Sequence, residues 1–366
     1  MSEQIRGICA FVVVVAHAWQ IFLLPLGIAP RMMDVLAGLV VWAVATFFIL
    51  SGMMIAFSLE RRTGPWQFDF PAYIWARILR IFPVLYLGVA LTLVVVTVIQ
   101  LFGFYGAESY KLPSDVFMTR DRAVFEYDRL LLTLTLTYNL LPGDVLSFNG
   151  PLWSLSYEFW MYILAGFLWL YRVRRAWWSA AAAVVLVAAM LLAPRTTLPF
   201  WVVWVVWGSG FLAGLHWPSL RGVKTSRVLM VALAFGAFVL LVGRGETLYL
   251  LRWAYGSLKA QLIYVGVSGI LLCGLLLLLR RPRLGGAVGV WLTRLGSYSY
   301  TLYAVHFPLM WFVFSCFRPS ILKFGFLGHA ALALVSVLIS LAFAALSARL
   351  VENRPLLNRW FPVPKT

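Results

Sequence analysis

The first hydrophobic segment of the chain carries two residues that could do chemistry, an arginine at its start and a histidine deep inside it. Arg6 and His17 are eleven residues apart in the run RGICAFVVVVAHAW, which ends at Trp19. In an α-helix this spacing places both side chains on nearly the same face, about 16 Å apart along the axis. We expect Arg6 to hold an anionic group at a membrane interface and His17 to act near the bilayer centre. A histidine that only hydrogen-bonds a neighbouring helix for packing is the alternative.

The composition defines the class of protein that must position these residues. The 366 residues are 63% hydrophobic and only 12% charged, and the mean hydropathy is +0.90. No soluble core requires so much apolar surface, so the sequence predicts a polytopic membrane protein. The net charge of +17 comes from basic residues clustered between apolar runs. That pattern favours lipid head groups or an anionic ligand over nucleic acid as the partner. The three cysteines lack the spacing of metal ligands, and we expect no metal.

The apolar runs predict an all-α fold with about ten transmembrane helices. The first run is of full span length, and we expect it to remain uncleaved. The segment near 131–142 is too short to cross comfortably, so we interpret it as re-entrant. We expect residues 1–366 to form a single transmembrane domain without an additional soluble domain. The predicted spans are 8–26, 33–58, 83–104, 149–171, 177–193, 198–215, 228–242, 261–279, 297–317 and 327–350.

The distribution of charge supports this topology. With the N-terminus in the cytoplasm, 19 of the 30 lysines and arginines fall on the inner side, including every dense basic cluster. Treating 131–142 as a full span would place the later basic clusters outside. The sequence therefore predicts that both termini are cytoplasmic and that the loop 105–129 lies outside.

A pair of arginines precedes the third predicted span. Arg77 and Arg80 are three residues apart, so they share one helix face and can grip one anionic group together. They lie just before Pro83, and we interpret them as a phosphate-binding pair. Arg61 and Arg62 are interpreted as residues that set the orientation in the membrane.

Two further ionisable residues fall inside predicted spans. Glu158 lies just inside the outer end of the fourth span, far from the arginines along the membrane normal, and a carboxylate there needs a partner or a water-filled cavity. It could orient a histidine or pair with a structural arginine. His306 reaches about the same depth as His17, which indicates a shared polar cavity or a packing residue. We expect His216 and His329 to be interfacial.

Six segments of the chain together form a recognisable pattern: Arg6 with His17, FFILSG (47–52), RILRIFP (77–83), PLWSLSYE (151–158), LGSYSYTLYAVHFP (295–308) and VENRP (351–355). In these segments the chain resembles the acyltransferase-3 family of polytopic membrane acyltransferases. The segments occur in the family's order and extend over nearly the whole chain. Two departures stand out: SEQIRGICA lacks an acidic residue two before the glycine, and Phe159 replaces a second carboxylate after Glu158.

The resemblance implies an enzyme of the bacterial inner membrane that uses acetyl-CoA or another acyl-CoA as donor. The acyl group would pass to a hydroxyl of a cell-surface polysaccharide or a lipid-linked sugar. The resemblance also implies contact with membrane lipids. It allows a further partner, either a second copy of the chain or a polysaccharide-assembly protein. The phosphates of acyl-CoA would be held by Arg6, Arg77 and Arg80, and the thioester would reach His17.

The most economical mechanism implied by the resemblance makes His17 the general base that deprotonates the acceptor hydroxyl. A covalent acyl-histidine is the other route. Glu158 is the second predicted catalytic residue. The predicted supporting residues, which could fix the histidine tautomer or stabilise an oxyanion, are Ser51, Trp153, Ser154, Tyr157, Tyr303 and His306.

Other functions are compatible with parts of this pattern. The acceptor could be a small molecule such as an antibiotic. A flippase or transporter of a lipid-linked glycan also needs a polar cavity, basic loops and ionisable residues inside the membrane. A structural assembly subunit would not need His17. The spacing of Arg6 and His17 favours an enzyme, because it suits a long anionic donor with a reactive end.

Overall fold

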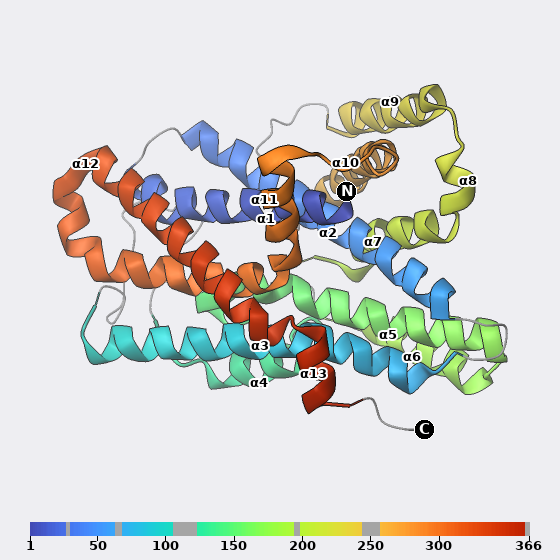
Figure 1. Ribbon diagram of the computed structural model, residues 1–366, viewed down its shortest axis with the longest axis horizontal. Coiled ribbons are helices and arrows are strands. Elements are labelled where there is room, and N and C mark those ends of the chain that lie inside the picture. The colour runs from blue at the N-terminus through green and yellow to red at the C-terminus, as the bar shows by residue number, and fades with distance from the viewer. Residues whose placement is uncertain (27–29, 63–67, 105–122, 194–197, 244–256, 363–366) are drawn as a thin grey trace.

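Figure 1 shows the computed structural model, which describes residues 1–26, 30–62, 68–104, 123–193, 198–243 and 257–362. Within these residues the chain forms helices, turns and bends, and no β-strand occurs. The all-α prediction is confirmed. The longer helices are α1 (Ser2–Ala18, continued by the π-helical turn Trp19–Leu23), α2 (Pro30–Arg62), α3 (Phe70–Leu101), α5 (Trp153–Arg174), α10 (Leu258–Leu278) and α12 (Ser299–Val351). The shorter ones are the 3₁₀ helices Leu24–Leu26 and Ser147–Leu152, α4 (Tyr127–Thr135), α6 (Trp177–Leu192), α7 (Phe200–Leu215), α8 (Trp217–Arg221), α9 (Thr225–Val242), α11 (Gly286–Ser297) and α13 (Arg354–Trp360).

Each of the ten predicted spans corresponds to a helix. Among the described residues, seven helices are long and apolar enough to cross a membrane, two of them as the arms Ser299–Phe317 and Gly325–Val351 of α12. The other three are α5, which has 22 residues and carries charges, and the apolar α6 and α7 of 16 residues each. The segment near 131–142 forms the nine-residue α4 and a left-handed turn at Leu136, so it does not cross as a helix.

The surface of these helices is apolar. In α9, only 6% of an 18-residue window with mean hydropathy 2.1 is buried within the protein. A helix that exposes so much hydrocarbon is stable only when another apolar phase covers it, and lipid supplies that phase. The protein is therefore a multi-pass membrane protein.

The third span begins earlier than the sequence predicted. We expected it to start at Pro83, but α3 begins at Phe70 and Pro83 lies inside the helix. The start of α3 is fixed by Asp69, whose Oδ1 accepts a hydrogen bond from the backbone N–H of Ala72 (2.9 Å). Pro71 lies in the first turn, where a proline is well tolerated. As a result the arginines that precede Pro83 lie well inside α3 instead of at its end.

A close approach between two helices positions Arg6. A Cβ atom on Gly7 would lie 2.3 Å from the carbonyl oxygen of Leu292 in α11, and one on Gly296 would lie 1.9 Å from that of Glu3. Only glycine at both positions allows α1 and α11 to pack this tightly. The side chain of Gln4 joins the same contact by donating to the carbonyl oxygens of Leu284 and Gly289. Helix α11 was not predicted from the sequence, and it lies between two of the predicted spans.

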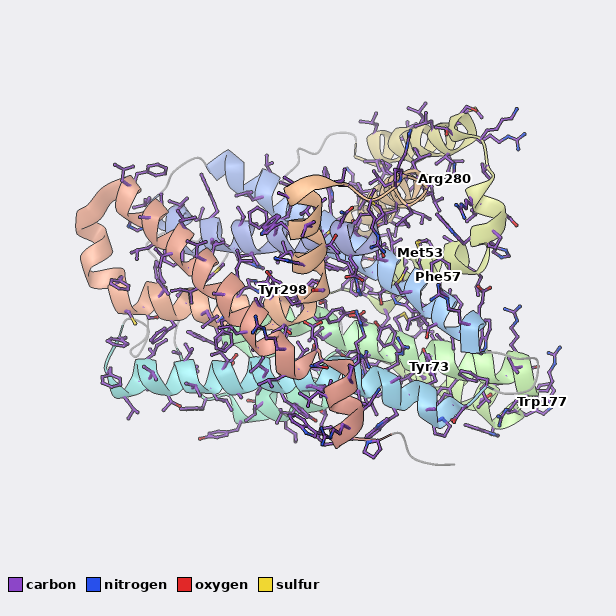
Figure 2. The ribbon with its side chains drawn as sticks, viewed as in Figure 1. Met53, Phe57, Tyr73, Trp177, Arg280 and Tyr298 are labelled. Atoms are coloured by element: carbon purple, nitrogen blue, oxygen red, sulfur yellow. The ribbon has the colours of Figure 1, made fainter. Side chains whose placement is uncertain are left out.

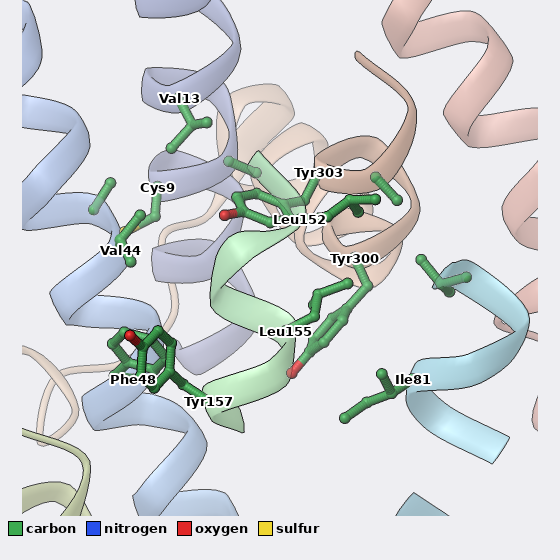
Figure 3. Packing of buried hydrophobic residues seen from close by; sticks show 14 of the residues in the cluster. Cys9, Val13, Val44, Phe48, Ile81, Leu152, Leu155, Tyr157, Tyr300 and Tyr303 are labelled. Atoms are coloured by element: carbon green, nitrogen blue, oxygen red, sulfur yellow. The ribbon is translucent and has the colours of Figure 1, made fainter. Parts of the chain in front are cut away.

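Buried side chains of α1, α2, α3, α5, α7 and α12 form one core. Figure 3 shows Tyr300 projecting from α12 beside Leu155 of α5. Tyr73 lies between α3 and α5 (Figure 2), where its hydroxyl donates to the carbonyl oxygen of Tyr162 (3.0 Å). The helices that carry the predicted functional residues are therefore packed directly against one another.

Two groups of hydrogen bonds join segments that the sequence places on the cytoplasmic side. In the first group, the Arg280 guanidinium donates to the carbonyl oxygens of Leu220 in α8 and Val223 just after it. In the second group, Arg77 Nη2 donates to Ser58 Oγ of α2 (3.1 Å). The chain after α12 reaches the same part of α3, where Arg354 donates to the carbonyl oxygen of Ala76. In Figure 1 α12 reverses its direction, and its non-helical residue is Gly325, with φ of 56°.

Candidate active site

Two arginines from different helices meet on one tyrosine at the start of α12. The guanidinium carbon of Arg80, from α3, lies 4.4 Å from the centroid of the Tyr300 ring, and that of Arg6, from α1, lies 5.3 Å from it. A cation over an aromatic face is attracted by the ring quadrupole, which holds both side chains in place without neutralising them. Two of the arginines predicted to bind the donor phosphates therefore lie together, although they are 74 positions apart in the chain.

Arg77 joins this cluster one turn away from Arg80. Its guanidinium lies over the rings of Tyr73 (5.3 Å) and Tyr162 (5.7 Å). The Nε atoms of Arg6 and Arg77 are buried, and neither finds a hydrogen-bond partner among the described residues. Buried donors are normally satisfied, which makes these two N–H groups candidate contacts for an anionic ligand.

Glu158 lies at the arginine end, which corrects its predicted position. Its Oε1 accepts hydrogen bonds from the hydroxyls of Ser51 (2.7 Å), Tyr162 and Tyr300. The prediction placed it far from the arginines because it assumed that they stand at the end of a helix. In fact Arg80 lies ten residues after the start of α3, about 15 Å along the axis, and so reaches the level of Glu158.

The two predicted histidines are hydrogen-bonded to each other. His17 Nδ1 lies 2.9 Å from His306 Nε2, and His306 Nδ1 lies 2.9 Å from the carbonyl oxygen of Leu302. A carbonyl oxygen only accepts, so the neutral ring of His306 carries its proton on Nδ1 and accepts on Nε2. His17 must then donate from Nδ1, and its neutral ring has the basic lone pair on Nε2. His306 is fully buried, whereas His17 is half-buried.

A cavity is lined by Tyr300, whose ring contacts Arg6 and Arg80, and by Tyr303, whose ring lies near that of His306. It contains about 420 Å³ of empty space, and Ser154 Oγ and the Tyr303 hydroxyl, 2.8 Å apart, form part of its wall. The Tyr303 ring centroid is 6.1 Å from that of His306. Because Tyr300, Tyr303 and His306 follow each other at three-residue intervals, one face of α12 leads from the arginines to the histidines. The full lining is Val44, Phe47, Phe48, Ser154, Leu155, Glu158, Ser299, Tyr300 and Tyr303.

Three predicted supporting residues have other neighbours than expected. The Tyr157 hydroxyl bonds the backbone of Leu198, before α7, so it does not fix a histidine tautomer. Trp153 packs edge-on against Phe48 and Tyr157. Ser51 directs its hydroxyl proton to the carboxylate at the arginine end, so it is not placed to stabilise an oxyanion beside the histidines.

Two residues of the closing VENRP segment, Arg354 and Glu352, lie near the arginine cluster and were not predicted as site residues. Arg354 Nη1 donates to the carbonyl oxygen of Ala76 in α3 (2.9 Å). Burial, together with the positive charges of Arg80 and Arg77, lowers the pKa of Arg354 to about 10. Glu352 Oε1 accepts from the backbone N–H (2.8 Å) and hydroxyl (2.5 Å) of Thr301 at the start of α12. VENRP was identified as a segment that resembles the family. Its position in the sequence, after the last predicted span, did not indicate that it packs against α3 and the start of α12.

The part of the chain that the structure describes contains no group of three or more His, Cys, Asp or Glu residues that could hold a metal ion. The functional groups present are a cluster of arginines that lie over tyrosine rings and a histidine pair with one basic nitrogen. The arrangement fits proton transfer near the end of a long anionic substrate.

The fold and the site are those of a helical membrane protein with an internal polar site, which suits group transfer inside the membrane. Comparison with protein families identifies the class: a family model described as an acyltransferase domain matches residues 2–348. The chain therefore belongs to the acyltransferase-3 family and is a membrane acyltransferase. Comparison with curated proteins and with solved structures gives no match.

Proposed function

We propose that the protein is an O-acyltransferase that moves an acyl group, an acetyl group in the first instance, from acyl-CoA to a hydroxyl of a cell-surface polysaccharide or lipid-linked sugar. The observation that carries this proposal is the cavity lined by Tyr300, which contacts Arg6 and Arg80, and by Tyr303, which lies near His306. Acyl-CoA has phosphates at one end and a thioester at the end of an extended arm. The separation of Arg6 and His17, about 16 Å along α1, suits such a molecule.

The proposed reaction needs one base and one proton path. His17 Nε2 removes the proton from the acceptor hydroxyl, whose oxygen attacks the thioester carbonyl carbon. The carbon–sulfur bond then breaks, and the CoA thiolate takes the proton from His17. His306 keeps the His17 proton on Nδ1, so that Nε2 is the basic atom throughout. Ser154 and Tyr303, which bond each other in the cavity wall, are the hydroxyls best placed to donate to the developing oxyanion.

Glu158 has a positioning role in this proposal. Its carboxylate bonds the hydroxyls of Tyr162 and Tyr300, whose rings face Arg77, Arg6 and Arg80. It thereby fixes the aromatic surfaces on which the guanidinium groups rest and offsets part of their charge.

Acyl-CoA turnover by the purified protein tests the proposed function. We expect release of free CoA thiol from acetyl-CoA to depend on an acceptor from a panel of lipid-linked and free glycans, and the acetyl group to appear on the glycan. A small-molecule acceptor would replace the glycan in the same assay. Translocation of a lipid-linked glycan without consumption of acetyl-CoA would show a flippase instead.

The arginine end is proposed to face the cytoplasm of a bacterial inner membrane, because acyl-CoA is made there and the basic clusters favour that side. Reporter fusions after Arg175 and after the C-terminal Thr366 are expected to give cytoplasmic signals. An external signal at either position would overturn this orientation.

Loss of an arginine from the cluster should weaken donor binding. Arg77→Ala and Arg80→Ala are each expected to lower the affinity for acetyl-CoA by about 1.5–3 kcal/mol for each charged hydrogen bond lost. Isothermal calorimetry on folded, purified variants measures the effect. Arg61→Ala is the matched control, because Arg61 is exposed at the end of α2. Equal affinities in all three variants would remove Arg77 and Arg80 from the donor site.

A further inference from the structure

A second cavity lies between α5 and α7, outside the proposed acyl-transfer site. It contains about 840 Å³ of empty space, and every residue that lines it is apolar or glycine except Arg172. Leu168 and Leu212 in its wall are 52% and 57% exposed, so the groove opens to the outside of the helix bundle. We call it the α5–α7 groove. Its lining is Met161, Leu164, Ala165, Leu168, Trp169, Arg172, Trp204, Trp207, Gly208, Phe211, Leu212 and Leu215.

The length of the groove matches one leaflet of a bilayer. On α5 it extends from Met161 to Arg172, and on α7 from Trp204 to Leu215, which is twelve residues in each case. The eleven steps between the first and the last of these residues cover about 16 Å of helix, and half of the hydrocarbon core is about 15 Å. A groove that is apolar over this length and open to lipid fits one hydrocarbon chain of one leaflet.

The charge at one end of the groove selects the head group. Arg172 lies in the last turn of α5, with its guanidinium carbon 4.8 Å from the centroid of the Trp169 ring. No ion pair of Arg172 is found among the described residues. A basic side chain next to a hydrocarbon site favours an anionic head group.

We infer that the α5–α7 groove binds one acyl chain of an anionic phospholipid, whose phosphate contacts Arg172. The lipid lies against the wall of the polar site, because Trp207 lines the groove and its Nε1 donates to Ser51 Oγ (3.3 Å), which donates to Glu158. This binding requires no acyl-transfer activity, so the inference stands apart from the proposed function.

Titration with defined lipids tests the head group. The purified full-length protein in detergent is titrated with phosphatidylglycerol or with phosphatidylcholine of the same acyl chains, and the tightest bound lipid is measured by native mass spectrometry. We expect about fivefold tighter binding of phosphatidylglycerol, the factor that corresponds to about 1 kcal/mol per basic residue near an anionic surface. Arg172→Gln should abolish this preference. Arg174→Gln, a matched exposed arginine that does not line the groove, should retain it.

Filling the groove tests the acyl chain. Gly208 lines it, and a Cβ atom there would meet no atom within 4 Å, so Gly208→Leu places a side chain in open space. We expect this variant to fold and to lose the tightest lipid, whichever head group is offered. Gly236→Leu on α9 is the control, because a Cβ atom at Gly236 also meets nothing within 4 Å. Retention of the lipid by Gly208→Leu, or of the preference by Arg172→Gln, would overturn the inference.

Discussion

The His17→Gln variant is expected to lose acyl transfer by about two to four orders of magnitude, the contribution of a positioned general base. Glutamine offers a hydrogen-bonding side chain of similar reach, but it cannot accept a proton at neutral pH. Binding of acetyl-CoA should persist, because Arg6, which we propose as a contact of its phosphates, lies about 16 Å away along α1, and Arg77 and Arg80 lie on α3. Turnover and calorimetry on the same preparation separate the two effects.

Two further variants define what this result means. His17→Ala should be as inactive as His17→Gln if the imidazole takes the proton, whereas glutamine should rescue a histidine that only packs. His216→Gln, at the C-terminal end of α7, is the control for a histidine outside the site and should retain full activity. Substantial transfer by His17→Gln would leave α1 as a scaffold and remove the general base from the mechanism.

The depth of a residue within its own helix could be predicted from the sequence. Counting 1.5 Å per residue separates Arg6 from His17, and it placed His306 at the depth of His17, where the structure has a hydrogen bond of 2.9 Å between them. The predicted spans likewise match helices because long apolar runs in a membrane have few alternatives to a helix. The predicted start of the third span was wrong by 13 residues, because Pro83 was interpreted as the first residue of the helix and α3 begins at Phe70.

Contacts between helices could not be predicted in the same way. The meeting of Arg6 and Arg80 on Tyr300 depends on how far each helix is rotated and shifted against its neighbours. That placement is set by contacts such as Gly7 against Leu292, which bring α1 and α11 together across 285 positions of the chain. Side-chain spacing within one helix contains no information on these offsets, so the partners of Glu158 and the place of Arg354 became apparent only in the structure.

The hydrogen-bond chain through His306 makes a second strong prediction, about how His17 is held. His306→Leu removes the acceptor for His17 Nδ1, and the ring can then place its proton on Nε2, where it is no longer basic. In serine proteases, loss of the partner that fixes the histidine tautomer lowers kcat by about 10⁴. We expect kcat to fall by about two orders of magnitude or more, with little change in the KM for acetyl-CoA, since the arginine cluster is unchanged.

His306→Gln distinguishes positioning from packing. The amide oxygen of glutamine can take the place of His306 Nε2 and accept from His17 Nδ1, so this variant should recover at least about tenfold of the kcat lost in His306→Leu. A role in packing alone predicts no such recovery, because leucine fills a fully buried site at least as well as a polar amide does. The thermal midpoint of each variant is measured beside its kinetics. Equal kcat values for the two variants at similar midpoints would show that His306 does not set the tautomer of His17.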